Sequence, residues 1–114
     1  MQDFHNLEVW KKAHQLALNL FKTTGNTSKH DPFLASQLRR LGTLIPARIT
    51  EGAAKDGNDE FARCLQLSRG HCYELEYLLL LSRDLDYLDS SLHDSLLDQL
   101  VAVRKMLSGL LRAL

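Results

Sequence analysis

The sequence has little of several residue types that define particular classes of protein. It contains only two cysteines, two prolines and six glycines among 114 residues, and aromatic residues make up 7%. So few cysteines exclude a small disulfide-stapled domain, and so few prolines and glycines exclude a collagen-like or low-complexity chain. No apolar run approaches the roughly 20 residues that span a bilayer, so we expect no membrane partner.

The two cysteines also indicate the compartment. Cys64 and Cys72 fall eight positions apart on one expected helix, which separates their Cα atoms by about 12 Å. That distance is too long for a disulfide, so both thiols are expected to be small buried hydrophobic residues in a reducing compartment. The first ten residues, MQDFHNLEVW, lack the charged and then apolar pattern of a secretion signal. We therefore expect a cytoplasmic protein.

The chain has no net charge, because 14 lysines and arginines balance 14 aspartates and glutamates. This balance argues against a strongly electrostatic nucleic-acid binder. The charge is nevertheless uneven: residues 1–50 carry seven basic and three acidic residues, or +4, whereas residues 51–114 carry seven and eleven, or −4. Such asymmetry can match one subunit's surface to the next, although an accidental distribution remains the alternative.

Motifs that carry chemistry are missing. The sequence contains no Gly-rich phosphate loop, no zinc-spaced Cys/His set and no nucleophile elbow. His71 and Glu74 are three residues apart, but a di-iron bundle needs two Glu-x-x-His motifs and this chain has none. We expect that the protein is not an enzyme and has no cofactor and no metal site. Its histidines are expected to pack against other residues or to face water.

Apolar periodicity predicts an all-α fold. Helices are expected over residues 7–24, 32–52, 59–85 and 92–111, with short loops between them. Four such helices predict a single domain, residues 1–114, built as an antiparallel up-and-down four-helix bundle. Residues 23–31 are expected to form a loop. Asn6 and either Ser90 or Ser91 are expected to cap helices, and Trp10, Ala13, Ala17, Leu20 and Phe21 are expected to face inward.

The segment SQLRRLGTLIPARITEG organises the rest of the chain. Asp31 and Pro32 predict a helix start, because Asp accepts the free N–H groups of the first turn and proline fits the first helical position. Pro46 predicts a kink in this helix, with two shorter helices as the alternative. A stripe at helical spacing is expected to face the core, and it comprises Leu34, Leu38, Leu41, Ile45, Ile49 and Gly52. Gly42 is a candidate for close contact with Gly70, a glycine in the middle of a helix.

A second set of residues predicts self-association. Phe33, Arg40, Leu44 and Glu51 form another stripe on the same helix, and the run YLLLL, Tyr77 to Leu81, covers the whole circumference of the third helix. An apolar girdle implies a further partner. The alternative is that Tyr77 and Leu80 are simply exposed singly. The expected oligomer interface is Phe33, Arg40, Leu44, Glu51, Tyr77, Leu78, Leu80 and Leu81.

Three stretches resemble a known family: FHNLEVWKKAHQLAL, SQLRRLGTLIPARITEG and EFARCLQLSRGHCYELEYLLLLSRDLDYL. They are similar to the four-helix-bundle, S23-type bacterial proteins encoded within intervening sequences of 23S ribosomal RNA genes. The family pattern Gln-Leu-x-Arg-Ala…Ser-Ile-Pro-x-Asn-Ile-Ala-Glu-Gly is matched by Gln37, Leu38, Arg40, Ile45, Pro46, Ile49, Glu51 and Gly52. Departures are Leu41, Leu44, Arg48 and Thr50, and Gly70-His71-Cys72 where Gly-Ser-Leu is common.

The resemblance implies a non-enzymatic bundle that assembles as a homo-oligomeric ring, typically a pentamer. A related branch, the accessory proteins of diversity-generating retroelements, partners a reverse transcriptase and nucleic acid through basic residues. Two functions therefore remain open: an oligomeric scaffold with protein partners, or an RNA- or DNA-associated accessory protein. The expected nucleic-acid contacts are Arg39, Arg40, Arg48 and Lys55, although local pairing of arginines with Glu51 is the alternative.

Overall fold

The structure of the protein is a computed structural model that describes all 114 residues, and every regular element in it is helical. The 3-10 helix η1 spans Phe4–Asn6. The α-helices are α1 (Glu8–Thr23), α2 (Gly25–His30), α3 (Pro32–Ala53), α4 (Asn58–Asp84) and α5 (Ser90–Ala113). The expectation of an all-α protein is confirmed. No helix combines the length and the apolar character that crossing a bilayer requires.

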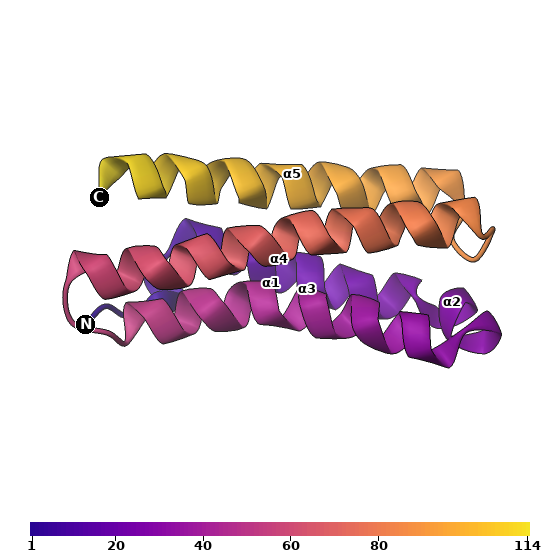
Figure 1. The fold of residues 1–114 in the computed structure, drawn as a ribbon, viewed down its shortest axis with the longest axis horizontal. Helices are drawn as coiled ribbons and strands as arrows, with labels where there is room; N and C mark the ends of the chain where they lie inside the picture. The colour runs from indigo at the N-terminus through magenta and orange to yellow at the C-terminus, as the bar shows by residue number, and fades with distance from the viewer.

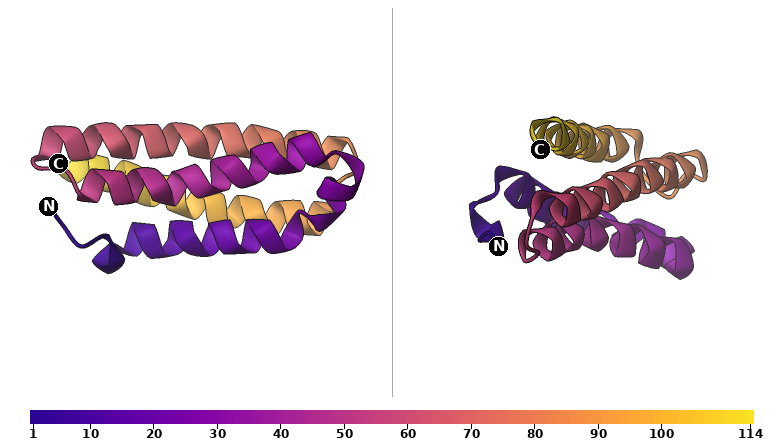
Figure 2. Two further views of the ribbon diagram at one scale, coloured as in Figure 1. Left: turned by 90° about the horizontal axis from the view of Figure 1, so that it is seen from below. Right: turned by 60° about the vertical axis from the view of Figure 1, so that its left-hand side comes forward.

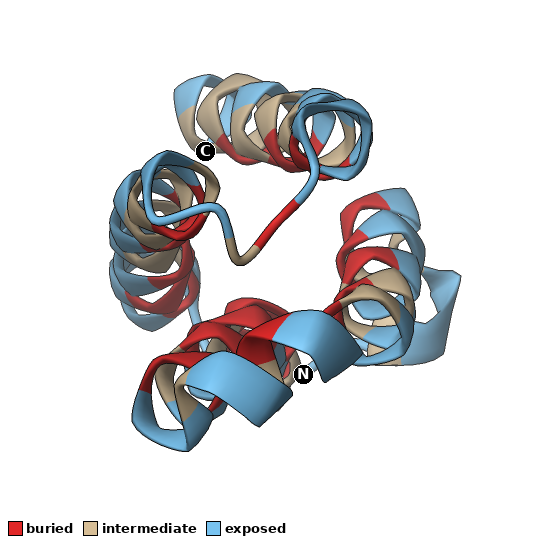
Figure 3. Ribbon diagram, turned by 90° about the vertical axis from the view of Figure 1, so that its right-hand side faces the viewer, coloured by how far each residue is buried: buried red, intermediate tan, exposed pale blue.

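The four long helices lie side by side along an axis of 44 Å, while the other two dimensions are 20 and 19 Å (Figure 1). Helix α1 contacts α3 and α5, and α4 contacts the same two helices, which closes a cycle around one core. The buried residues line the inner sides of the helices (Figure 3). The result is a bundle-like protein with a single core.

Contacting residues on α3 and α4 follow opposite orders along the two helices. Ser68 Oγ donates to the Ile45 carbonyl oxygen at 2.9 Å, and Gly52 lies against Phe61 and Cys64. Residues later in α3 therefore meet residues earlier in α4. This pairing sets the relative height of side chains on the two helices.

Helix α3 begins as expected and continues past its internal proline. Asp31 Oδ1 accepts from the Leu34 backbone N–H at 2.9 Å, and Pro32 occupies the first turn. Pro46 lies inside the unbroken helix Pro32–Ala53, so the alternative of two shorter helices is wrong.

Residues 23–31, expected to be a loop, contain the short helix α2. Thr27 is fully buried, and Asn26 Nδ2 and Thr27 Oγ1 both donate to the Tyr87 carbonyl oxygen, at 2.9 and 3.2 Å. The ring of His30 stacks on the ring of Tyr87 with centroids 5.3 Å apart. Contacts with a residue 60 positions later in the sequence hold this helical turn, so the local sequence did not predict it.

Two of the expected caps are wrong. Leu7, and not Asn6, precedes α1 and makes no side-chain cap, while Asp3 caps η1 through the His5 backbone N–H at 3.0 Å. At α5 the cap is Asp89, which accepts from the Ser91 N–H at 2.8 Å, because a carboxylate one residue earlier reaches the free N–H groups.

The expected contact between Gly42 and Gly70 is also wrong. A Cβ on Gly42 would lie 2.5 Å from Leu20 Cδ2 of α1, whereas Gly70 is exposed with nothing within 4 Å. Gly52 is the glycine at the contact between α3 and α4, where a Cβ would lie 2.8 Å from Cys64 Cβ. Glycine at this position lets the two helices pack closely.

Candidate functional site

A hollow between α4 and α5 contains most of the exposed apolar side chains of α4. This surface, named here the α4/α5 hollow, is lined by Tyr73, Glu76, Tyr77, Leu80, Arg83, His93 and Leu97. Tyr73, Tyr77 and Leu80 are 57%, 61% and 37% exposed. In an isolated chain, these three neighbouring side chains lie open to water.

The run Tyr77 to Leu81 divides between the core and the surface. Leu79 is fully buried, and Leu78 and Leu81 are partly buried against the core. Only Tyr77 and Leu80 open outward. Three of the five large residues are therefore covered by the chain itself, and the two outward residues belong to the α4/α5 hollow.

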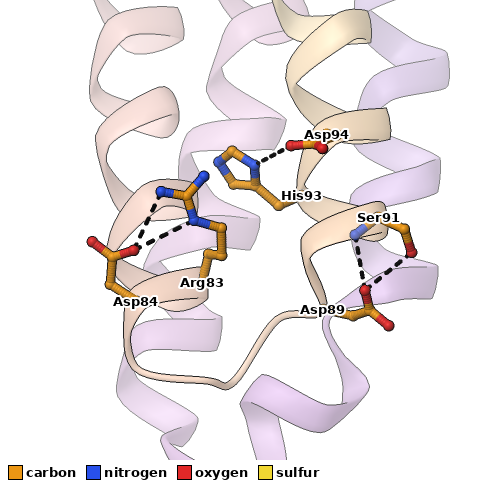
Figure 4. A network of polar contacts seen from close by, with 6 residues as sticks. All are labelled: Arg83, Asp84, Asp89, Ser91, His93 and Asp94. Atoms are coloured by element: carbon orange, nitrogen blue, oxygen red, sulfur yellow. Dashed lines mark hydrogen bonds and ion pairs between the residues drawn. The ribbon is translucent and has the colours of Figure 1, made fainter.

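Two carboxylates contact the polar side chains that line the α4/α5 hollow. Arg83 donates to Asp84 Oδ1 at 3.3 and 3.4 Å, and the buried His93 ring places Nδ1 3.0 Å from Asp94 Oδ1. The Arg83 guanidinium and the His93 ring extend toward each other from α4 and α5 (Figure 4).

Further along the same two helices, Arg104 of α5 pairs with Glu76 of α4, and its guanidinium carbon lies 4.6 Å from the centre of the Tyr73 ring. The cation over the ring holds Tyr73 in place on the surface. The hollow therefore has aromatic and aliphatic walls with fixed polar groups at its rim.

The outward stripe of α3 is a second exposed surface. Phe33, in the first turn of the helix, is 73% exposed, and Arg40 is exposed with no hydrogen bond or ion pair in the chain. Leu44 is half-buried, and Glu51 accepts from Arg48 at 3.0 Å. The residues predicted as interface thus lie on the surface of α3, and their role in assembly stays a prediction.

The four basic residues predicted to contact nucleic acid differ in their surroundings. Arg39 Nε donates to Thr24 Oγ1 at 2.9 Å, so this side chain links α3 to the end of α1. Arg48 is engaged by Glu51, as the alternative of local pairing predicted. Arg40 and Lys55 are exposed and have no ion pair within the chain.

Phe21 is a surface residue that the sequence placed wrongly. It was expected to face inward, but it is 49% exposed, and the Arg39 guanidinium carbon lies 5.2 Å from its ring centre. A shallow groove brings Phe21 together with Arg39, Arg40 and Leu44. The signal for this exposure in the sequence was the position of Phe21 at the edge of the apolar stripe of α1.

The polar groups in and near the core do not form a reactive site. Burial raises the pKa of the Cys72 thiol to about 12, against a smaller opposing effect from the charge of Arg104. Cys64 is buried as well. His71 Nδ1 lies 2.9 Å from Glu74 Oε1, yet no three His, Cys, Asp or Glu side chains come together in a geometry that could hold a metal. The candidate sites are therefore the exposed surfaces, which could bind a partner.

The fold and its surfaces together define a small, all-helical, bundle-like protein with two exposed apolar surfaces. The profile of the family described as 23S rRNA-intervening sequence protein matches residues 5–109. The chain belongs to this family, which confirms the resemblance seen in its sequence. The link to retroelement accessory proteins stays a prediction.

One solved structure gives an independent comparison of the fold. It is a protein of unknown function from the S23 ribosomal protein family of Bacteroides thetaiotaomicron VPI-5482. The match has a TM-score of 0.84 and 21% sequence identity, and it covers 90% of this chain and 97% of that chain. At this identity the likeness shows a shared fold. No curated protein matches the sequence.

Proposed function

We propose that this protein is a non-enzymatic cytoplasmic module that assembles with copies of itself into a ring and acts as a scaffold. Five is the subunit count that the family resemblance implies. The observation that carries the proposal is the exposure of Tyr73, Tyr77 and Leu80 together in the α4/α5 hollow. Contiguous exposed apolar residues mark interaction sites more often than singly exposed residues do.

The expected gain from covering these side chains is comparable to the cost of association. A buried aromatic side chain removes roughly 150–250 Å² from water, at about 25 cal/mol per Å². Covering the exposed parts of two tyrosines, a leucine and Phe33 therefore favours contact by several kcal/mol, on the order of the cost of immobilising a partner.

Within each copy, we infer an antiparallel up-and-down four-helix bundle in which α3 bends at Pro46. The opposite order of contacts along α3 and α4 supports this topology, and α4 and α5 behave similarly: Arg69 bonds Ser108 and Glu76 pairs with Arg104. A proline inside a helix removes one hydrogen bond and favours a bend.

Light scattering after gel filtration tests the proposed assembly. We expect a mass several times the 13.0 kDa of one chain at micromolar concentration. A mass of one chain across that concentration range would remove the proposal. The same measurement on Ser95→Asp, an exposed position of α5 outside the hollow, is the control and should give the wild-type mass.

A second candidate function is the binding of single-stranded RNA or DNA at the groove that contains Phe21, Arg39 and Arg40. The observation that favours it is the exposed Phe21 ring beside two arginines, because bases stack on aromatic rings while cations contact phosphates. Residues 36–55, which hold the arginines, contain no aromatic residue, so the sequence alone did not predict a stacking surface here.

A binding titration with a fluorescent single strand at several salt concentrations tests this second candidate. Phosphate contacts predict a steep loss of affinity with added salt, and Arg40→Ala should weaken binding and reduce that dependence. Arg63→Ala, which removes an exposed arginine of α4, is the matched control. The absence of measurable affinity at low salt would eliminate nucleic acid as the partner.

A further inference from the structure

We infer that the contact between copies joins two different surfaces: Phe33 of one copy enters the α4/α5 hollow of the next. This inference rests on the proposed self-assembly and specifies which surfaces meet. The occupant is therefore a second copy of this chain. Shape, position along the molecule and charge each support the pairing.

The shapes of the two surfaces are complementary. Phe33 projects from the first turn of α3 and is 73% exposed, and the cap of Asp31 on the Leu34 N–H holds that turn in a fixed conformation. The hollow offers two tyrosines, Leu80 and Leu97 as walls. A projecting ring that enters an apolar pocket is the usual anchor of a protein interface.

The two surfaces also lie at the same height on the molecule. Ser68 of α4 bonds Ile45 of α3, and the two helices run in opposite directions there. Phe33 is 12 residues before Ile45, and Leu80 is 12 residues after Ser68, so the two are level. The start of α3, which carries Phe33, and the end of α4, which carries Leu80, both lie near the end of the molecule where α2 meets the α4–α5 connection (Figures 1 and 2).

Equal height on different sides of the molecule has a consequence for the assembly. When two copies joined in this way keep their long axes parallel, they stand side by side, and each is rotated about that direction relative to its neighbour. A contact between two unlike surfaces repeats from copy to copy and forms a ring when the rotation closes. The inferred contact therefore accounts for a ring and would not by itself give a twofold dimer.

The segments that meet carry opposite charge. Residues 29–40, the segment that contains Phe33, hold Lys29, Arg39 and Arg40 against Asp31, or +2. The charged side chains at the hollow are Glu76, Asp84 and Asp94 against Arg83 and Arg104, or −1 when histidine is counted as neutral. Opposite potentials steer association and disfavour contact between two like surfaces.

Mixing two surface variants tests the inference. Phe33→Asp removes the projecting ring and leaves the hollow intact, whereas Tyr77→Asp damages the hollow and leaves the ring intact. Both residues are exposed, so each variant should keep the wild-type circular dichroism and melting temperature. Leu18→Asp, an exposed leucine of α1 outside both surfaces, is the matched control and should assemble as the wild type does.

The expected masses follow from counting intact contacts. Each variant alone should behave as a single chain of 13.0 kDa. An equimolar mixture has one intact pair, the Phe33 of the Tyr77→Asp copy and the hollow of the Phe33→Asp copy. Light scattering over a concentration series should therefore give two chains for the mixture and no larger species.

Three results would overturn the inference, and they separate its failure from that of the proposed function. If the wild type assembles and Phe33→Asp assembles equally well, only the pairing of surfaces is wrong. A mixture that stays at one chain, with an assembled wild type, indicates a contact between like surfaces. A wild-type protein that stays a single chain would rule out self-assembly. If that protein gains mass only when single-stranded RNA is added, nucleic acid is the occupant.

Discussion

At the scale of single residues, Gly52 shows how closely α3 and α4 pack. A Cβ at this position would lie 2.8 Å from Cys64 Cβ and 3.0 Å from Phe61 Cδ1. Neither neighbour has room to move, since both are buried. A methyl group here therefore requires the two helices to separate.

We predict that Gly52→Ala lowers the free energy of unfolding by about 1–3 kcal/mol, the usual cost of overpacking a core. Gly70→Ala is the matched control, because Gly70 is exposed in the middle of α4 with nothing within 4 Å. It should raise the free energy of unfolding by about 0.5–1 kcal/mol. Urea titration followed by circular dichroism measures both, and equal stability of the two variants would contradict the packing described.

The buried thiols give a second prediction at this scale. Burial raises the Cys72 pKa from 9.0 to about 12, which makes the reactive thiolate rarer by a factor on the order of 1000. Both cysteines should react with a thiol reagent at pH 8 only as fast as the protein unfolds. A cysteine introduced by Ser91→Cys at the exposed start of α5 should react at once. Rapid labelling of the native wild type would show that the thiols are accessible.

At the scale of elements, helix α3 depends on the cap at its start. Asp31 satisfies the Leu34 N–H at 2.9 Å in the turn that presents Phe33. We predict that Asp31→Ala lowers the free energy of unfolding by about 1 kcal/mol, whereas Asp31→Asn, which keeps an oxygen acceptor, costs a few tenths. Thermal melts at pH 7 compare the two variants. An equal loss for both would indicate that the negative charge matters and that the cap does not.

The long helices were predictable because their apolar stripes are regular and their ends carry recognisable residues. Asp31 with Pro32 predicted the start of α3, and the stripe from Leu34 to Gly52 is buried as expected. Helix α2 was not predictable, since its Thr27 is held by the distant Tyr87. Local sequence carries no information about such a contact.

The candidate surfaces were predictable in part. Successive residues of an α-helix are rotated by about 100° around its axis, and this rotation predicted the outward stripe of α3. Phe33 and Arg40 are exposed as that geometry requires. Leu78 and Leu81 share the run with Tyr77 and Leu80 but pack on the core, which depends on where the neighbouring helices lie. The exposure of Phe21 depends on the same tertiary placement.

At the scale of the whole molecule, zero net charge conceals a division into a basic first half and an acidic second half. The fold places exposed apolar residues within both halves, Phe33 in one and the α4/α5 hollow in the other. If these two unlike surfaces meet as inferred, each copy can contact two neighbours, one through each surface. Assembly through these two surfaces should therefore end in a closed ring.

Native mass spectrometry of the wild-type protein tests that claim most directly, because it counts the subunits. We predict one dominant species with a fixed number of chains, at an integer multiple of 13.0 kDa, whose size does not grow with concentration. A closed ring leaves no free surface for further copies. A protein that remains a single chain, or a ladder of species that lengthens as concentration rises, would contradict the account.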